Sequence, residues 1–382
     1  MKVLHLLKTS VGAGWALRQI RELVRLGVEV HVALPDGGPM VGKYTAVGAT
    51  EHMLQTDFPI RSPWRFPSVV AKMSALVRSV QPDIIHSHFV GTTLTMRLAL
   101  GRHHDIPRVF QVPGPLHLEN TFFRNAEIAT AGSRDYWIGS CEWTCQRYQK
   151  SGIIADRIFL SYYGGDLDLL QPGPRGYLRE KLGLSESTKI IGMVAFMYAP
   201  KRYLGQIRGL KGHEDLIDAF SLCLQNNPDL RCVFLGGSWG DAASYEHKVK
   251  VYAKKKCGDN AIFLGTRSDV PLIYPDFDVA IHPSYSENVG GAGESLLMGV
   301  PTIATNIGGF PDVVINGETG WLVPPHSPDV LARTITMALS DPVEARIRAH
   351  RGQKLVRDMF NIKNTAKEVS VIYQKILGHE GA

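Results

Sequence analysis

The sequence predicts an α/β protein of two doubly wound domains, in each of which helices cover both faces of a parallel sheet. Three observations predict this fold class. The length of 382 residues is typical of two domains. Short apolar runs alternate along the chain with segments that repeat apolar residues at helical spacing. Apolar residues make up 44% of the chain and charged residues 20%, which suffices for a core in each half.

The first half contains six candidate strands, which we interpret as the sheet of a Rossmann-like domain. They are residues 3–7, 28–34, 83–88, 109–112, 137–139 and 158–163. Between the first two strands, Ala16, Ile20 and Leu23 recur at the spacing of one helix face, which predicts a connecting helix. Strands that alternate with helices in this way pair in parallel.

The second half repeats the pattern, with candidate strands at residues 190–195, 232–236, 262–265, 279–282, 302–305 and 321–323. We therefore expect domains at 1–168 and 187–360, joined by a turn-rich linker at 169–186. The final segment, 361–382, is predicted to be a helix that packs back across the hinge. Doubly wound domains bind ligands at the carboxyl ends of their strands, so a cleft between the two domains is the expected site.

Charge and composition disfavour several classes of protein. The net charge is +6, with most of the excess in residues 1–180, but no dense Lys/Arg tract with interleaved aromatic residues favours nucleic-acid binding. No run approaches the roughly 18 apolar residues of a membrane span. No leader cleavage site is evident, so we expect a cytoplasmic protein, with a peripheral contact at the inner face of the membrane left open. The five cysteines lack metal-ligand spacing and are expected to be free thiols.

The most informative stretch, residues 284–312, has the pattern of a glycine loop, a helix, a strand and a second glycine loop. Gly290 and Gly291 let backbone N–H groups approach a ligand, and the helix that begins there presents unpaired donors and a positive dipole end to a phosphate. Glu287 and Glu294 beside this loop suit sugar hydroxyls at the two ends of a nucleotide-sugar. An ordinary strand-to-helix turn with a carboxylate at the helix start is the alternative.

A basic, glycine-punctuated loop precedes the first helix of the second half. Its cationic side chains are Lys201, Arg202, Arg208 and Lys211. Because the loop follows a strand, these charges can stabilise a diphosphate that departs as the sugar bond breaks. A solvated basic loop is the alternative. Arg267 also follows a strand, and it or the local backbone can meet a nucleotide base.

Gly12 and Gly14 follow the first strand, in a loop that can approach a phosphate or a sugar. The third glycine of a dinucleotide fingerprint is absent and no carboxylate ends the second strand, so NAD binding is disfavoured. A tight turn between strand and helix explains the two glycines equally well.

Three further groups of side chains follow or end strands of the first half. His117 and Glu119 lie in a loop that Pro113 and Pro115 stiffen, and either can bond a sugar hydroxyl or assist proton transfer from an acceptor. A structural role is the alternative for both.

His86 and His88 flank Ser87, and we expect one of them to pack in the core while the other faces the ligand. Neither has a partner at metal-ligand spacing. Asp166 and Asp168 have the spacing of a carboxylate pair that can hold a divalent metal, although turn capping explains them better.

The order of these motifs resembles that of GT-B glycosyltransferases of family 4, also described as glycosyl transferases group 1. The resemblance covers nearly the whole chain. It rests on the Gly12–Gly14 loop, Tyr163-Gly-Gly-Asp166, Leu210-Lys-Gly-His213, Glu294-Ser-Leu-Leu-Met-Gly-Val-Pro301 and Val313-Val-Ile-Asn-Gly-Glu-Thr-Gly-Trp-Leu-Val323. It implies two Rossmann-like domains that face each other across a cleft, and a retaining hexosyltransferase that uses a nucleotide diphosphate sugar.

The resemblance also implies roles for individual residues. Glu294 should bind the ribose, Glu287 the donor sugar, and backbone amides around Gly290 and Gly291 should complete the sugar site. Lys211 should neutralise the diphosphate, and His117 should lie near the sugar. Family members generally need no metal ion or cofactor, so none is expected here. The predicted catalytic residues are thus His117, Lys211 and Glu287, and the predicted donor-binding residues are Gly12, Gly14, Arg202, Arg208, Lys211, Arg267, Glu287, Gly290, Gly291 and Glu294.

Three departures from the family pattern bear on these roles. Glu287 and Glu294 are one residue closer in sequence than usual, which affects the role of Glu287 most. Phe196 stands where an arginine often follows the first strand of the second domain, and Arg202 or Arg208 is a hypothetical replacement. The first glycine loop lacks the usual double glycine.

Other functions of the same two-domain plan remain open at the level of sequence. They are a sugar-nucleotide epimerase and a non-catalytic nucleotide-sugar-binding subunit. The preferred acceptor is a lipid-linked sugar in polysaccharide or glycoconjugate assembly, because the first domain is basic and Thr121-Phe-Phe-Arg124 offers surface apolar groups. A soluble acceptor fits almost as well.

Overall fold

A computed structural model describes residues 1–59, 62–112, 114, 116–167, 171–202 and 205–378. The chain divides into two compact units. The N-terminal unit comprises Met1–Leu167 together with Met359–Ala382, and the C-terminal unit comprises Asp168–Asp358. Pro113, Pro115 and Asp168, to which the sequence analysis assigned roles, lie outside the described residues.

The N-terminal unit is built on a seven-stranded parallel sheet in the order β3-β2-β1-β4-β5-β6-β7. The strands are β1 (Lys2–Leu6), β2 (Glu29–Leu34), β3 (Thr50–Met53), β4 (Ile84–Ser87), β5 (Arg108–Gln111), β6 (Asp135–Gly139) and β7 (Ile158–Leu160). The helices are α1 (Gly14–Arg25), α2 (Lys43–Ala46), α3 (Phe66–Val80), α4 (Val90–Leu100), α5 (Leu116–Glu119), α6 (Thr121–Ala129), α7 (Glu142–Lys150) and α16 (Ile362–Gly378). Short 3-10 turns occur at Pro63–Arg65 and Ala155–Arg157.

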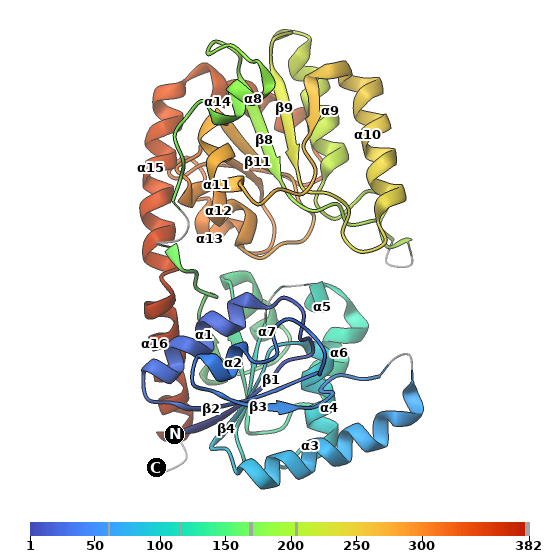
Figure 1. Cartoon of the computed structure of the whole chain (residues 1–382), viewed down its shortest axis with the longest axis vertical. Coiled ribbons are helices and arrows are strands. Elements are labelled where there is room, and N and C mark those ends of the chain that lie inside the picture. Colours follow the sequence, from blue (N-terminus) through green and yellow to red (C-terminus); the bar gives the residue numbers. More distant parts are fainter. Residues whose placement is uncertain (60–61, 113, 115, 168–170, 203–204, 379–382) are drawn as a thin grey trace. The chain divides into compact units, whose positions relative to one another are not determined.

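The C-terminal helix α16 is part of the N-terminal unit and lies beside α1 (Figure 1). Its apolar face carries Val369, Ile372 and Ile376, which share one buried cluster with Ile20 and Leu23 of α1. The apolar spacing predicted both helices correctly, because each buries one stripe against the same core.

Strand β3 was not predicted from the sequence. Its residues, Thr-Glu-His-Met, contain no apolar run, and none of them is fully buried. An edge strand pairs on one side only, here with β2, and therefore carries a weaker apolar signal than a central strand such as β4, which is buried throughout.

The C-terminal unit contains a six-stranded parallel sheet in the order β10-β9-β8-β11-β12-β13. The strands are β8 (Ile190–Val194), β9 (Arg231–Leu235), β10 (Ala261–Phe263), β11 (Val279–His282), β12 (Thr302–Thr305) and β13 (Trp321–Val323). The helices are α8 (Tyr177–Leu182), α9 (His213–Leu224), α10 (Ala243–Cys257), α11 (Val270–Ile273), α12 (Gly290–Leu297), α13 (Phe310–Val313), α14 (Pro328–Ser340) and α15 (Pro342–Met359). Further 3-10 turns occur at Gly258–Asn260 and Tyr274–Asp276.

Part of the segment expected to be a linker is folded into the C-terminal unit as helix α8. The buried carboxylate of Asp276 accepts hydrogen bonds from the backbone N–H of Gly176 at 2.7 Å and of Leu178 at 2.6 Å. These are orphan donors at the start of α8, so Asp276 caps the helix from a distant part of the chain. No local sequence pattern reveals a cap of this kind, which explains why the glycines and prolines before α8 suggested a linker.

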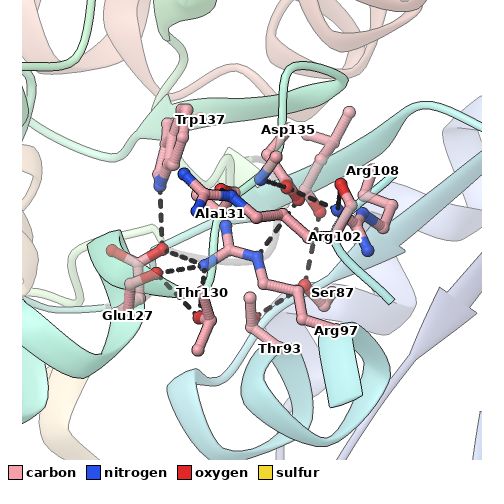
Figure 2. Close-up of polar contacts among 12 residues, drawn as sticks. Ser87, Thr93, Arg97, Arg102, Arg108, Glu127, Thr130, Ala131, Asp135 and Trp137 are labelled. Carbon is pink, nitrogen blue, oxygen red and sulfur yellow. Dashed lines mark hydrogen bonds and ion pairs between the residues drawn. The ribbon is translucent and has the colours of Figure 1, made fainter. Parts of the chain in front are cut away.

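The N-terminal unit also buries a network of ion pairs (Figure 2). Arg97 donates to Glu127 at 2.9 Å and to Asp135 at 3.1 Å, and Arg108 donates to Asp135 at 2.6 Å. The indole N–H of Trp137 donates to Glu127 at 3.0 Å. The four charged side chains are at most 1% exposed and join α4, β5, α6 and β6. Buried charges of this kind are tolerated only while they remain paired.

Replacing Asp135 with alanine is expected to lower the free energy of unfolding by about 3–5 kcal/mol, because two buried guanidinium groups lose their shared carboxylate. Chemical denaturation followed by fluorescence measures the change. Glu29→Ala is the matched control, since Glu29 is 60% exposed and its ion pair with Lys2 spans 3.6 Å. If both substitutions lowered the free energy of unfolding to the same extent, the buried network would not contribute more to stability than an exposed ion pair.

Candidate functional site

The C-terminal unit has a pocket of about 290 Å³ at the carboxyl ends of its central strands. β8 and β11 are parallel neighbours although they are not consecutive, so the order in which strands are added to the sheet reverses between them (Figure 1). Doubly wound sheets bind ligands at such a switch point. The pocket is lined by Met193, Val194, Ala195, Phe196, Tyr198, Lys211, Leu235, Gly236, Thr266, Arg267, Val270, His282, Ser284, Glu287, Gly291 and Glu294.

Lys211, which we predicted to meet the diphosphate, and Glu287, which we predicted to meet the donor sugar, form an ion pair in this pocket. The side chains are 17% and 19% exposed, so solvent reaches both. The two loops are also joined by their backbones, because the N–H of Tyr285 donates to the carbonyl of Leu210 at 2.9 Å. The pairing fixes the ammonium group of Lys211 at the pocket wall.

Two glycines allow the loops to approach so closely. Gly212 has a φ of +73°, and a Cβ there would lie 2.0 Å from the carbonyl oxygen of Pro283. Gly308 has a φ of +49°, and a Cβ there would lie 1.9 Å from the carbonyl oxygen of Glu287. Any other residue would push these loops apart. The second glycine loop noted in the sequence thus supports the backbone of Glu287 from behind.

Helix α12 begins at Gly290 and brings Gly291 and Glu294 to the pocket. The first N–H groups of the helix have no partner within it, so this end is suited to an anion. Burial raises the pKa of Glu294. Gly291 faces His282, since a Cβ on Gly291 would lie 2.9 Å from Nδ1 of that imidazole. Both glutamates line the same pocket even though their sequence separation is shorter than usual.

The other predicted basic residues have different positions. Arg267 lines the pocket and forms a two-pronged contact with Asp269, at 2.8 and 2.5 Å. Arg208 turns to α9, where it pairs with Asp215 at 2.5 Å and with Asp218 at 2.8 Å. Arg202 is exposed. Of the described cationic residues that we predicted in this loop, only Lys211 lines the pocket. Neither Arg202 nor Arg208 therefore replaces the arginine that the family often has after the first strand of this domain.

An aromatic group occupies the place where that arginine was expected. Phe196 and Tyr198 both line the pocket, and Trp239 packs against them with ring centroids 5.1 and 5.8 Å away. The ammonium of Lys211 lies 5.7 Å from the centroid of the Tyr198 ring, within reach of a cation–π contact.

We did not predict His282, Ser284 or Thr266 as site residues, although each follows or ends a strand that leads into the pocket. His282 is buried and its Nε2 lies 3.0 Å from the hydroxyl of Ser295. Burial, with a smaller effect of Lys211, lowers the pKa of His282 to about 3, so the imidazole is neutral. The sequence feature that could have identified His282 as a site residue is its position at the end of β11.

The predicted site residues of the N-terminal unit are placed as follows. Gly12, with a φ of +77°, precedes α1, and Gly14 is the first residue of that helix. His117 lies in α5, half-buried, with Nε2 3.2 Å from the hydroxyl of Tyr148. Burial lowers its pKa to about 4. Glu119 is exposed, and Asp166 forms an ion pair with Arg21, while its proposed partner Asp168 is not described.

The expectation that His86 and His88 would face different surroundings was wrong. Residues two apart on a strand point to the same face, and both side chains are fully buried with ring centroids 4.2 Å apart. A third histidine, His5 of β1, lies against them. The five cysteines are free, as expected, and all are buried.

Chemically, the pocket combines a lysine ammonium, an arginine, a helix N-terminus and two carboxylates around one cavity. The cations and the helix end suit phosphate oxygens, and the carboxylates suit hydroxyl groups, which donate hydrogen bonds. Together with two doubly wound sheets, this arrangement is typical of enzymes that act on activated sugars.

Comparison with known proteins identifies the family. The model described as Glycosyl transferases group 1 matches residues 202–355, and the model described as Glycosyltransferase Family 4 matches residues 15–169. The chain belongs to the GT-B glycosyltransferases of family 4 and group 1, and is a glycosyltransferase.

Individual relatives agree with this assignment. A D-inositol 3-phosphate glycosyltransferase of Corynebacterium glutamicum (strain R) is 31% identical over 236 residues, covering 59% of this chain and 53% of the relative. The protein of the same name from Corynebacterium diphtheriae is 25% identical over 84% of this chain and 79% of the relative. The first match thus spans about half the length of that relative.

The fold is shared with Anabaena Alr3699/HepE in complex with UDP. The TM-score is 0.80 at 19% identity, over 98% of this chain and 100% of the other. The same protein is also similar in its complex with UDP-glucose, with a TM-score of 0.78 at 20% identity over 98% of this chain and 99% of the other. At this identity the likeness concerns the fold alone. None of the helices in the described part of this chain is both long and apolar enough to cross a membrane.

Proposed function

We propose that this enzyme transfers a sugar from a nucleoside diphosphate sugar to a hydroxyl acceptor with retention of the anomeric configuration. The observation that carries the proposal is the convergence of Lys211, Glu287, Gly291 and Glu294 on one pocket at the switch point of the C-terminal sheet. A site with cations for the diphosphate and carboxylates for two sets of hydroxyls fits a donor of that chemistry.

In this proposal each side chain contributes to one part of the donor. The N-terminus of α12 and the ammonium of Lys211 receive the diphosphate and stabilise the negative charge that develops as the bond to the sugar breaks. Glu294 accepts hydrogen bonds from the ribose, and Glu287 accepts them from the sugar. The leaving phosphate removes the proton of the acceptor hydroxyl on the same face of the sugar. No step of this sequence requires a metal ion.

The acceptor is proposed to be bound by the N-terminal unit, with His117 as a hydrogen-bonding group. Because burial keeps the pKa of His117 at about 4, the neutral imidazole acts as a hydrogen-bonding group across the physiological range of pH. The exposed rings of Phe122 and Phe123 beside Arg124 favour an acceptor with a lipid anchor, in polysaccharide or glycoconjugate assembly at a membrane surface. The names of the relatives contain an inositol phosphate, so a soluble acceptor of this kind should be tested beside the lipid-linked one.

The experiment incubates the full chain with UDP-, GDP-, ADP- and TDP-sugars, each with and without lipid-linked and soluble acceptors. We expect release of the nucleoside diphosphate and a new glycoside only when an acceptor is present, and NMR should show that the anomeric configuration of the donor is retained. Conversion of the donor without an acceptor would indicate an epimerase instead. An inverted product would refute retention, and an intact donor despite tight binding would indicate a non-catalytic subunit.

A further inference from the structure

The N-terminal unit contains a fully buried cluster of three histidines that the donor site does not use. His5 lies on β1 and pairs in register with His86 on β4, and His88 follows two residues later. The ring centroids are 4.2 to 5.3 Å apart, and none of the three side chains is exposed. Burying a polar group lowers the stability of the fold unless the group has a hydrogen-bond partner or a ligand. The burial of three imidazole rings in one core therefore requires an explanation.

The position of the cluster is that of a ligand site. β1 and β4 are adjacent although not consecutive, so the order of the seven-stranded sheet reverses between them. This is the switch point of the N-terminal sheet, equivalent to the place between β8 and β11 where the donor pocket lies. Trp15, directly after the Gly12–Gly14 loop, packs its ring 5.3 Å from that of His88.

Hydrogen bonds fix which nitrogen of His88 carries the proton. The hydroxyl of Tyr163 donates to the carbonyl of Gln111 at 3.1 Å, because a carbonyl can only accept. Nδ1 of His88 lies 3.0 Å from the same hydroxyl and therefore donates to it. Nε2 of His88 lies 3.0 Å from Nδ1 of His5, and one nitrogen of such a pair must accept, so a lone pair lies between these two rings.

His86 is left with an unused nitrogen. Its Nδ1 contacts the hydroxyl of Tyr373 on α16, and Tyr373 is also 3.5 Å from Nε2 of His5. The other nitrogen of His86, Nε2, is buried and has no hydrogen-bond partner among the described residues. Each histidine thus faces a tyrosine hydroxyl with one nitrogen, which leaves the other nitrogen for a ligand within the core.

We propose that His5, His86 and His88 bind one divalent transition-metal ion, with zinc as the reference ion. The three side chains can each offer one nitrogen such that the nitrogens all lie within 4.8 Å of one another. Nitrogens around a tetrahedral zinc ion are about 3.4 Å apart, so modest rotations of the rings complete the site. His5 moves its proton to Nε2, and its Nδ1 then binds the ion in place of the hydrogen bond to His88.

The chemistry of the site selects the ion. Three neutral imidazoles suit zinc, copper or nickel, whereas magnesium and calcium prefer carboxylate and carbonyl oxygens. Tyrosine hydroxyls that receive the second N–H of a ligating histidine orient the ring and strengthen the bond to the metal. Because Tyr373 belongs to α16, the ion links β1 and β4 to the C-terminal helix. The site is structural and separate in role from the metal-free transfer proposed above.

Equilibrium dialysis of the chelator-treated full chain against Zn²⁺ alone tests the proposal. We expect one equivalent of zinc per chain, a rise in Tm on binding, and the visible absorption of tetrahedral cobalt when Co²⁺ replaces zinc. His86→Gln should abolish this equivalent. Tyr373→Phe, which keeps the ring but removes the hydroxyl, should weaken binding by about 10- to 100-fold.

The matched control is His52→Gln. His52 and His31 form a part-buried pair, with ring nitrogens 2.9 Å apart, and no third histidine completes it in the described chain. This variant should keep the full equivalent of zinc. Equal zinc uptake by the wild type and His86→Gln would overturn the proposal. If His86→Gln does not fold, as judged by circular dichroism, unchanged zinc affinity in Tyr373→Phe would overturn it.

Discussion

Replacing Lys211 with alanine is expected to lower kcat for sugar transfer by about 10²- to 10³-fold, the usual cost of removing one group that stabilises developing charge in a transition state. Lys211 lines the pocket that we propose for the donor, and its ammonium group pairs there with Glu287. The leaving diphosphate gains charge only as the sugar bond breaks, so the loss should appear in kcat more than in the donor KM.

Steady-state kinetics with saturating acceptor measures this effect. Lys201→Ala is the control, because Lys201 belongs to the same loop, carries the same charge and is exposed. It should keep nearly full activity. A fall in kcat of similar size in both variants would mean that the loop acts through its general charge and that the position of Lys211 is immaterial.

Replacing Glu294 with alanine is expected to weaken donor binding by about 10- to 100-fold, which corresponds to the roughly 1.5–3 kcal/mol of a hydrogen bond to a charged group. Glu294 lies on α12 and lines the pocket proposed for the donor, and burial limits competition from water. Calorimetric titration with the nucleoside diphosphate, without its sugar, isolates the contribution of the ribose. Glu318→Ala, at an exposed position of the same unit, should leave the affinity unchanged.

The pKa of Glu294 adds a dependence on pH. Because burial raises this pKa, the carboxyl group takes up its proton at a higher pH than an exposed glutamate would. The ionised form accepts hydrogen bonds with both oxygens and carries the negative charge that strengthens them, whereas the protonated form has one oxygen that donates instead. Donor affinity should therefore weaken as the pH falls through the raised pKa. Glu294→Ala should lack this component, and an identical pH profile in that variant would contradict the assignment.

Much of the fold could be predicted because central parallel strands are buried on both faces. β11, β12 and β13 begin and end at the predicted residues, and the stripes of α1, α9 and α16 follow helical spacing. β3 and α8 could not be predicted in this way. The first is a polar edge strand, and the second is capped by Asp276, nearly a hundred residues further along the chain.

The sequence predicted the residues that line the pocket where these residues come after the end of a strand. It did not predict the position of a side chain where contacts with distant residues determine that position. Lys211, Glu287 and Glu294 each follow the end of a strand, and the switch point brings these ends together. Arg208 has the same charge and a similar place in sequence, but Asp215 and Asp218 draw it to α9. The histidine cluster depends on a register between β1 and β4 that no local pattern in the sequence reveals.

The central claim, that the C-terminal unit holds the diphosphate of the donor between Lys211 and α12, is tested most directly by ligand-induced stabilisation of the full chain. A Tm screen with UDP-, GDP-, ADP- and TDP-sugars should show a rise with one of these donors, because binding to the native state stabilises it. The rise should be much smaller in Lys211→Ala and in Glu294→Ala. If both variants keep the full rise of the wild type, the donor binds elsewhere and the assignment of this pocket is wrong.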